Sequence, residues 1–523
     1  MTEQRFRTRE FSQLGRFALT LGIGTWLIAG CTLGPDYSAP DSATPTSWFA
    51  WRGKAADPPA TPSRAVAEPI DPAWWGLFDD PQLTALVGRV AGANLDVRLA
   101  AIRIDESRAE RGIVASAQFP TINGNASYVR QQASNRGIFT RLGSNAAGAT
   151  AANGTPGGAG GVNHVQLEPF EAYQYGLDAS WELDLWGKVR RAVESSDASI
   201  TSSEEALRGV LLSSLAEVAR DYMELRGAQL RLAIARDNLK TARQSQGIVA
   251  QRAAGGLATD LDAANAAAQV STVAADIPRI EQEEAHLMNA LGLLLGELPQ
   301  ALRAELETAK PIPPVPPTVP VGFPSELAAR RPDIRQADAN LHAATADIGV
   351  AEANFYPSLT LNGSVGIQAL RTQSLWNLNA LQYAFGPALT IPIFEGGRLK
   401  SQLALRKAQQ REAAVKYQQT VLTAWTEVDD ALTAYTAEQR RRQQLIEAVR
   451  QNRRALSLAQ SRYQAGVSDF IEVLDTQRSQ LATEQLLAIS TANVSGNLVA
   501  LYKALGGGWE PDLPLASADA TGK

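Results

Sequence analysis

Two groups of carboxylates each follow directly after a glycine turn, one group in each half of the chain. They are Asp260 and Asp262 after Gly255 and Gly256, and Asp469, Glu472 and Asp475 after Gly466. On a helix, steps of three residues shift a side chain by about 60°, so the second group fans across one broad face. Carboxylates brought close together repel one another and favour cations. The alternative is a solvated helix surface that binds nothing.

The sequence offers little for catalysis or metal binding. His164, His286 and His342 are widely separated and show no ligand spacing, and the single cysteine excludes an intramolecular disulfide. The glycine-rich stretch 153–161 lacks the Lys-Ser/Thr that ends a phosphate-binding loop. A net charge of −5 gives no basic excess to neutralise phosphates, so nucleic acid is not expected as a partner. We expect neither an enzyme nor a cofactor.

Long helices must position the carboxylates. Residues 398–465 contain no Gly or Pro and are rich in strong helix formers, which predicts a rod of about 100 Å. After Gly466 the helical pattern resumes over residues 468–505, so the two segments form an antiparallel hairpin. A helix of this length must lie against other long helices to be stable.

The first half of the chain repeats this hairpin. A helix over residues 188–254 reaches the Gly255-Gly256 turn and returns over residues 257–296, where Pro278 predicts a kink. Shorter helical segments are expected from Pro81 to just before Pro120, and over residues 325–355.

Four stretches change from helical to alternating periodicity, with apolar side chains on one face and polar or small ones on the other. They are residues 121–130, 173–185, 358–368 and 383–393. Their length and pattern are typical of membrane-spanning strands. A half-buried soluble sheet has the same local pattern, but an export signal and aromatic residues near the strand ends favour the membrane. Pro387 predicts a bulge or local break in the fourth strand.

The two halves have the same order of elements and the same register. The positions that match at an offset of 210 are residues 186–190 with 396–400, 217–218 with 427–428, Arg252 with Arg462, and Gly256 with Gly466. Upstream, residues 119–120 match 356–357 at an offset of 237, because a glycine-rich loop lengthens the first half. The chain is therefore predicted to be one duplicated architecture.

The N-terminus reads as a bacterial lipoprotein signal. A basic start is followed by an apolar run over residues 17–30, which ends in small residues before Cys31. Cys31 would be lipidated and become the mature N-terminus, and Thr32 after it favours sorting to the outer membrane. An incidental cysteine is the alternative. Residues 31–71 are rich in Pro, Ala, Ser and Thr and predict an extended tether. Packing roles are expected for Trp48, Trp51, Trp74 and Trp75.

These patterns divide the chain into six parts. They are the signal peptide 1–30, the lipid-anchored tether 31–71, the first repeat 72–310, a Pro-rich connector 311–323, the second repeat 324–508 and a C-terminal tail 509–523.

Several stretches resemble one known family. FPSELAARRPDIRQADANLHAATADIGVAEANFYPSLTL, ELDLWGKVRR, PIFEGGRLKSQ and QSRYQAGVSDFIEVLDTQRSQL closely resemble the TolC-like outer membrane efflux family, in its OprM/NodT-type lipoprotein branch. The resemblance covers nearly everything after residue 70. It implies a mainly α fold with a four-stranded membrane β segment, assembled as a homotrimer with a 12-stranded β-barrel and a long α-helical barrel in the periplasm.

The same resemblance implies function and partners. Such proteins are passive exit ducts in the outer membrane of Gram-negative bacteria. They conduct drugs and other small molecules from the periplasm to the outside, and they work together with a periplasmic adaptor and an inner-membrane RND transporter. Four strands cannot close a barrel alone, and open strand edges are not tolerated in lipid. Dimers and trimers both satisfy closure, and the resemblance selects the trimer.

The resemblance also assigns roles to individual residues. Asp262, Glu472 and Asp475 match gate carboxylates, and Tyr463 matches a gate aromatic. Ser468 departs from the pattern, since some relatives carry a gate arginine there. The predicted gate comprises Asp260, Asp262, Tyr463, Asp469, Glu472 and Asp475. The predicted adaptor-contacting tip comprises Arg252, Gly255, Gly256, Arg462 and Gly466. Arg252 and Arg462 are candidates to replace the gate arginine that is absent at Ser468. Asp178, Glu182 and Asp184 are predicted to line the lumen from the second strand.

Two alternatives stay open at this level. One is a duct of the same fold that serves type I protein secretion, although the lipoprotein signal and the style of the motifs favour small-molecule efflux. The other is a periplasmic coiled-coil scaffold lipoprotein without a pore.

Overall fold

The computed structural model describes residues 32–40, 48, 62–132 and 169–509. The chain divides into two compact units, and each unit takes segments from both halves of the sequence. Unit 1 comprises Met1–Asp36, Glu110–Ser196 and Thr345–Ala408, and unit 2 comprises Tyr37–Ala109, Asp197–Ala344 and Gln409–Lys523. The duplicated halves therefore intertwine instead of folding as separate domains.

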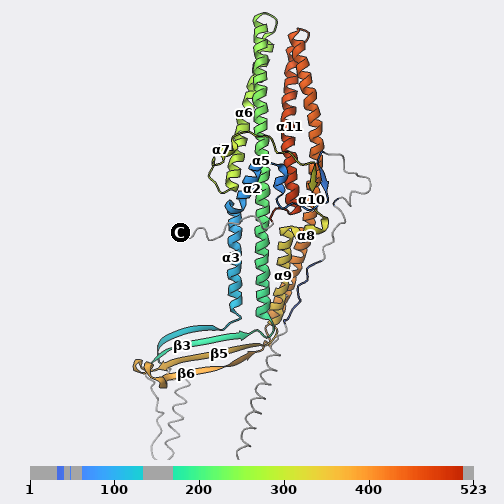
Figure 1. Ribbon diagram of the computed structural model, residues 1–523. Helices are drawn as coiled ribbons and strands as arrows, with labels where there is room; N and C mark the ends of the chain where they lie inside the picture. The colour runs from blue at the N-terminus through green and yellow to red at the C-terminus, as the bar shows by residue number, and fades with distance from the viewer. Residues whose placement is uncertain (1–31, 41–47, 49–61, 133–168, 510–523) are drawn as a thin grey trace, which may run out of the picture. The chain divides into compact units, whose positions relative to one another are not determined.

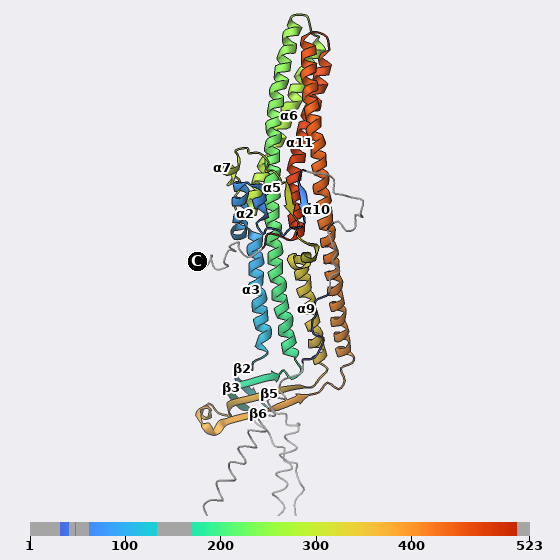
Figure 2. The same cartoon turned by 45° about the vertical axis from the view of Figure 1, so that its right-hand side comes forward.

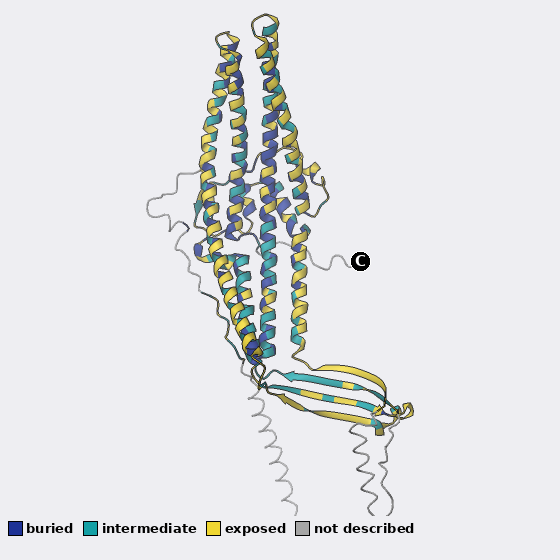
Figure 3. Ribbon diagram, turned by 180° about the vertical axis from the view of Figure 1, so that it is seen from behind, coloured by how far each residue is buried: buried dark blue, intermediate teal, exposed yellow. Residues whose placement is uncertain are grey.

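Unit 1 contains a four-stranded antiparallel sheet (Figures 1 and 2). Its strands are β2 (Thr121–Gln131), β3 (Phe170–Leu183), β5 (Ser358–Ala369) and β6 (Leu381–Thr390), in the order β2-β3-β5-β6. Figure 3 shows both faces of the strands as exposed or intermediate, and among their residues only Ala369 is buried. The four predicted strands are confirmed, and this sheet has no hydrophobic core layer of its own.

The prediction of a bulge at Pro387 is wrong. The pairing of β5 with β6 runs in one uninterrupted register from Ser358↔Thr390 to Ile367↔Leu381, and Pro387 lies opposite Leu361. The physical reason is that Pro387 only lacks an N–H, and within this chain β6 has β5 as a neighbour on one side only, so the β5–β6 register can continue past it. The strand also ends at Thr390, earlier than the expected residue 393.

Two helical hairpins dominate the described chain. The first is α5 (Lys188–Ala254) with α6 (Asp260–Leu294), and the second is α10 (Arg398–Gln464) with α11 (Phe470–Leu505). Both α5 and α10 have 67 residues, so each is about 100 Å long as the sequence predicts. The helix α6 continues through Pro278 without interruption. None of the helices among the described residues is long and apolar enough to span a membrane.

Shorter helices precede each pair of strands. In the first half these are α2 (Pro81–Ala93) and α3 (Leu95–Ser116), which Asn94 separates, and in the second half α8 (Leu327–Arg330) and α9 (Pro332–Ala353). A four-residue helix α7 (Arg303–Leu306) follows the first hairpin.

Side chains at these junctions show the duplication directly. Asn94 Nδ2 donates to the carbonyl oxygen of Leu294 (2.8 Å), and Arg331 Nη1 donates to that of Ala504 (2.9 Å). Arg331 lies 237 positions after Asn94, and Ala504 lies 210 positions after Leu294, which are the two offsets of the sequence repeat. Each bond fastens the start of a shorter helix to the end of a hairpin.

The core of unit 2 includes part of the segment predicted to be a tether. Strand β1 (Arg64–Val66) pairs in parallel with β4 (Thr318–Pro320) of the Pro-rich connector. Trp74 is fully buried and stacks on Tyr502, with ring centres 5.4 Å apart. The prediction of an extended tether over residues 31–71 is therefore wrong for residues 62–71, which contact distant elements of unit 2, and for residues 32–36, which bond to Trp186 and Arg191 in unit 1. Trp48, Trp74 and Trp75 are buried as predicted, and Trp51 lies outside the described residues.

Candidate functional site

The two hairpin turns have the same backbone geometry. Gly256 and Gly466 have φ angles of +71° and +76°, a region that favours glycine. The N–H of Leu257 donates to the carbonyl of Arg252 (2.8 Å), and the N–H of Val467 donates to that of Arg462 (3.0 Å). These bonds close the ends of α5 and α10 in the manner of a Schellman motif, so the repeated glycines determine both turns.

Arg252 connects the two hairpins. Its guanidinium donates to the carbonyl oxygens of Tyr463 (2.8 Å) and Gln464 (3.3 Å) at the end of α10. It also lies 4.7 Å from the centre of the Tyr463 ring. The last carbonyls of a helix lack intrahelical partners and carry partial negative charge, so a cation there is favourable. Arg252 belongs to α5 and yet caps α10.

An apolar cluster lies beneath this contact and draws residues from all four long helices. Its buried members are Val249, Ala266, Leu456, Ala459, Tyr463, Phe470, Val473 and Leu474. The rings of Tyr463 and Phe470 lie 5.5 Å apart. We call Arg252 and this cluster the turn cluster. The structure thus brings Arg252 and Tyr463, which are 211 residues apart in sequence, into one site.

The carboxylates near the turns have different environments. Asp262 Oδ2 accepts bonds from the backbone N–H (3.0 Å) and the hydroxyl (2.7 Å) of Thr259, which makes a capping box at the start of α6. Glu472 lies 3.9 Å from Arg462 Nη1. Asp260, Asp469 and Asp475 are exposed, and their carboxylates make no hydrogen bond or ion pair with the residues that the structure describes. Asp260 next to the first turn, and Asp469 and Asp475 next to the second, therefore present exposed negative charge.

Two buried hydroxyls of the second turn have no partner within the described chain. They belong to Tyr463 and Ser468. Burial raises the pKa of the Tyr463 hydroxyl, which keeps it protonated and able to donate. Buried polar groups are normally satisfied, so these hydroxyls are available to water or to another polar group outside the described residues.

Sequence reasoning did not identify the polar contacts that join α11 to the first hairpin. Gln477 Nε2 donates to Ser245 Oγ (2.7 Å) in a buried position, and Arg478 Nε donates to Gln269 Oε1 (2.9 Å). Their side chains look like ordinary surface residues in the sequence. The only feature of the sequence that could have indicated them is that Gln477 and Arg478 lie within one helical turn of the predicted gate residue Asp475.

The three strand acids do not form one row. The Asp178 carboxylate accepts bonds from Asn123 (3.2 Å) and Asn125 (2.8 Å) of the neighbouring strand. Glu182 lies 3.3 Å from Lys188 Nζ. Asp184 lies beyond the end of β3, and the prediction that it is a strand residue is wrong.

Asp184 has a clear local role instead. Its carboxylate accepts bonds from the backbone N–H groups of Val189 (3.1 Å) and Arg190 (2.9 Å). These N–H groups belong to the first turn of α5 and have no intrahelical acceptors. Asp184 therefore fixes the start of α5. The predicted lipidation site, Cys31, lies outside the described residues.

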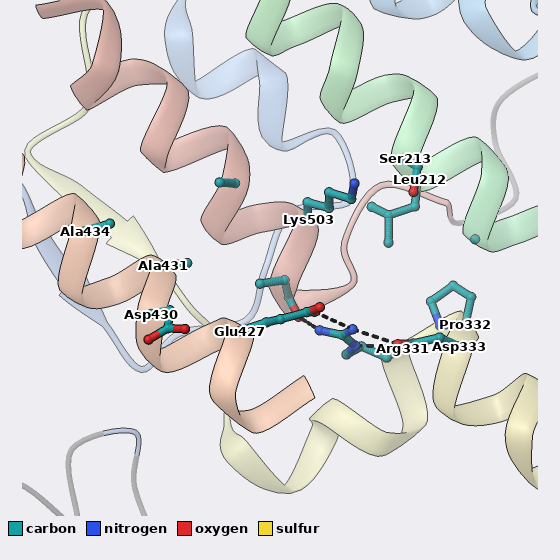
Figure 4. A pocket seen from close by; sticks show the side chains of 13 residues that line it. Leu212, Ser213, Arg331, Pro332, Asp333, Glu427, Asp430, Ala431, Ala434 and Lys503 are labelled. Carbon is teal, nitrogen blue, oxygen red and sulfur yellow. Dashed lines mark hydrogen bonds and ion pairs between the residues drawn. The ribbon is translucent and has the colours of Figure 1, made fainter. Parts of the chain in front are cut away.

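A pocket of about 560 Å³ lies in unit 2 beside the α8–α9 junction (Figure 4). Arg331 forms ion pairs with Asp333 and Glu427, both at 2.7 Å, and its side chain is only 8% exposed. These charges pair with one another, which indicates that they join α9 to α10 and do not bind a ligand. Within the described residues, no three or more His, Cys, Asp or Glu side chains gather to hold a metal ion.

The comparison with known families identifies the chain. The family model described as "Outer membrane efflux protein" matches residues 86–297 and 323–507, more than half of the sequence. The chain belongs to the outer membrane efflux protein family. The two matched stretches lie in the two halves of the duplicated chain.

Individual relatives align over almost the whole length. Outer membrane protein OprJ of Pseudomonas aeruginosa is 32% identical over 94% of this chain and 95% of its own. The probable outer membrane lipoprotein SilC of Salmonella typhimurium is 30% identical over 94% and 98%. The solved structure of the outer-membrane channel OprN superposes with a TM-score of 0.79 at 33% identity, covering 92% of this chain and all of that one.

These findings confirm the family resemblance and the fold class. The chain has the duplicated TolC-like fold, with long helices and a four-stranded β segment. As an outer membrane efflux protein it is an exit component for efflux in the outer membrane of a Gram-negative bacterium, and a transport protein rather than an enzyme.

Proposed function

We propose that three copies of this chain form one continuous duct, which a periplasmic adaptor couples to an inner-membrane RND transporter for the export of small molecules such as drugs. The observation that carries the assembly is the order β2-β3-β5-β6, which leaves one edge of β2 and one edge of β6 unpaired among the residues that the structure describes. Unpaired backbone groups are not tolerated in lipid, so β6 of one copy should pair with β2 of the next. Three such sheets would give 12 strands.

The turn cluster is the proposed gate. Threefold symmetry would place the exposed carboxylates after both turns around a common axis as acidic rings. The unpartnered hydroxyls of Tyr463 and Ser468 would find acceptors on a neighbouring copy. Opening would shift the helix ends and break these contacts, and adaptor binding would bias the population toward the open arrangement. The glycine turns and Arg462 would contribute to the adaptor-binding tip.

The first test addresses the cargo. Deleting the gene should raise intracellular dye and antibiotic accumulation, and complementation with the intact gene should restore it, because a blocked exit stops the whole pump. Accumulation is measured across a broad panel of dyes and antibiotics in the deletion and complemented strains. Unchanged accumulation across the panel, together with loss of a secreted protein, would instead favour the protein-secretion duct.

The second test addresses the acidic rings. Replacing Glu472 and Asp475 together by Ala should reduce block by divalent cations and change single-channel conductance in planar bilayers, since two negative charges per copy leave the ring. The matched control is the isosteric pair Glu472→Gln and Asp475→Asn. If charge is responsible, both pairs shift the block in the same direction. Traces identical to wild type in both would remove these residues from the gate, and a complete lack of conductance in the wild type would favour the scaffold.

A further inference from the structure

The first described residues of the chain are held tightly within unit 1. We call residues 32–36 the strap. The N–H of Leu33 donates to the carbonyl of Trp186 (3.2 Å), and Arg191 Nε donates to the carbonyl of Leu33 (3.0 Å). The backbone of Leu33 is therefore bonded to Trp186, in the segment that joins β3 to α5, and to Arg191, in the first turn of α5. A flexible linker would show neither contact.

Glycines make room for the strap on α9. Gly349 is buried, and a Cβ added there would lie 2.6 Å from the Leu33 carbonyl oxygen and 2.8 Å from Arg191 Cγ. Real Cβ atoms essentially never come this close, so any larger residue would displace the strap or the arginine. Gly34 faces Gly349 with a φ angle of +90°. The site fits the strap only while position 349 has no side chain.

A buried arginine closes the site. The Arg191 side chain is 5% exposed, and its guanidinium pairs with Asp36 (2.6 Å) at the end of the strap and with Glu194 (2.8 Å) on its own helix. Charge-assisted bonds to a guanidinium are stronger than neutral ones, and burying the cation makes its partners necessary. Asp36 itself is 90% exposed, so this pairing holds the strap without burying it.

Aromatic residues lie at the same junction. Trp186 and Tyr356 have ring centres 4.9 Å apart, and Trp186 Nε1 donates to the carbonyl of Pro357 (2.7 Å), one residue before β5. Tryptophan and tyrosine at strand ends are typical of the membrane–water interface. The beginning of the strap, at Leu33, therefore lies beside the strand ends, where the strands would leave the membrane.

We propose that Arg191, Gly349 and the Trp186 carbonyl form a clamp that fixes the lipid anchor at the junction between strands and helices. The inference rests on the proposed lipidation of Cys31, which is one peptide unit, about 3.8 Å, before Thr32. A free tether would let the protein body move tens of ångströms from its lipid. The clamped strap instead brings the acylated end to the bilayer surface beside the strand ends, and so sets the depth at which the sheet enters the membrane.

The experiment compares two glycine substitutions in the full-length mature protein. Gly349→Ala should displace the strap, whereas Gly112→Ala on α3 adds a methyl group with nothing within 4 Å. Deuterium exchange of the Leu33 amide, which donates to the Trp186 carbonyl, followed by mass spectrometry, should be at least about tenfold faster in Gly349→Ala and unchanged in Gly112→Ala. Asp36→Ala, at an exposed position, should also speed exchange and covers the case in which Gly349→Ala does not fold. Equal exchange in the wild type, Asp36→Ala and any folded Gly349→Ala protein would overturn the clamp.

A second arm tests the link to lipid. Inserting about ten Gly/Ser residues between Thr32 and Leu33 keeps the lipidation sequence but separates the anchor from the docked strap. We expect normal protection of the Leu33 amide, an acylated N-terminal peptide by mass spectrometry, and fewer heat-modifiable oligomers in the membrane. Wild-type oligomer levels would overturn the role of the clamp in membrane depth. An unmodified N-terminal peptide in the wild type would overturn the lipid anchor, while efflux and conductance would still report on the duct separately.

Discussion

Replacing Arg252 by alanine should increase the open probability of the channel in planar bilayers by about tenfold or more. The variant loses two charge-assisted bonds to the carbonyls of Tyr463 and Gln464 and the stacking on the Tyr463 ring. Bonds to charged groups contribute about 1.5–3 kcal/mol and an exposed cation–π contact about 0.5–1 kcal/mol. Since about 1.4 kcal/mol corresponds to tenfold in a population ratio, even partial loss of this contact is measurable.

The duplication supplies a matched control for this prediction. Arg462 occupies the same position in the second repeat, but it lies 3.9 Å from Glu472 and its side chain is 58% exposed. Exposed ion pairs contribute little, so Arg462→Ala should leave the open probability within about twofold of wild type. Arg252→Lys should be intermediate, because one ammonium group cannot reproduce the planar stacking. Equal effects of the two alanine substitutions would show that Arg252 does not hold the closed arrangement.

The sequence predicts the elements well because their signals are periodic and occur twice. The expected helix over residues 188–254 coincides with α5, and the expected run 398–465 differs from α10 by one residue. Gly256 and Gly466 mark both turns, since a positive φ angle strongly favours glycine. Alternation also located all four strands, although not their ends.

The contacts and residues that the sequence did not predict correctly share a physical cause. The partners of Arg252 are main-chain carbonyls on another helix, and no sequence pattern shows which carbonyls a cation will reach. Asp184 is in phase with the strand alternation, but the unsatisfied N–H groups of α5 compete for its carboxylate. Residues 62–71 show no hydrophobic periodicity and are nevertheless ordered, because β4, from a distant part of the chain, supplies hydrogen-bond partners to β1 within them. Long-range polar contacts therefore determine the candidate site, and local pattern determines the framework.

The largest loss of stability is expected at Arg226, a fully buried residue of α5. Its guanidinium donates to Gln82 Oε1 (2.7 Å), to Gln229 Oε1 (2.5 Å) and to the carbonyls of Leu306 and Thr308 (3.4 and 3.0 Å). These are all neutral acceptors, so the cation is held by dipoles and by the face of the Tyr222 ring at 4.8 Å. A cation in such a place is tolerated only while every acceptor stays in position.

Arg226→Ala should therefore lower the free energy of unfolding by about 3 kcal/mol or more, because it leaves a cavity and several buried acceptors unsatisfied. Arg226→Met fills the space but satisfies no acceptor, so it should recover only part of the loss. Arg236→Ala is the control on the same helix, since Arg236 is 60% exposed and its partner Glu281, 2.8 Å away, is 46% exposed; its effect should stay within about 0.5 kcal/mol. Denaturant midpoints of the purified proteins give the comparison. If Arg226→Met were as stable as the wild type, cavity filling and not hydrogen bonding would hold α2 and the 303–308 segment against α5.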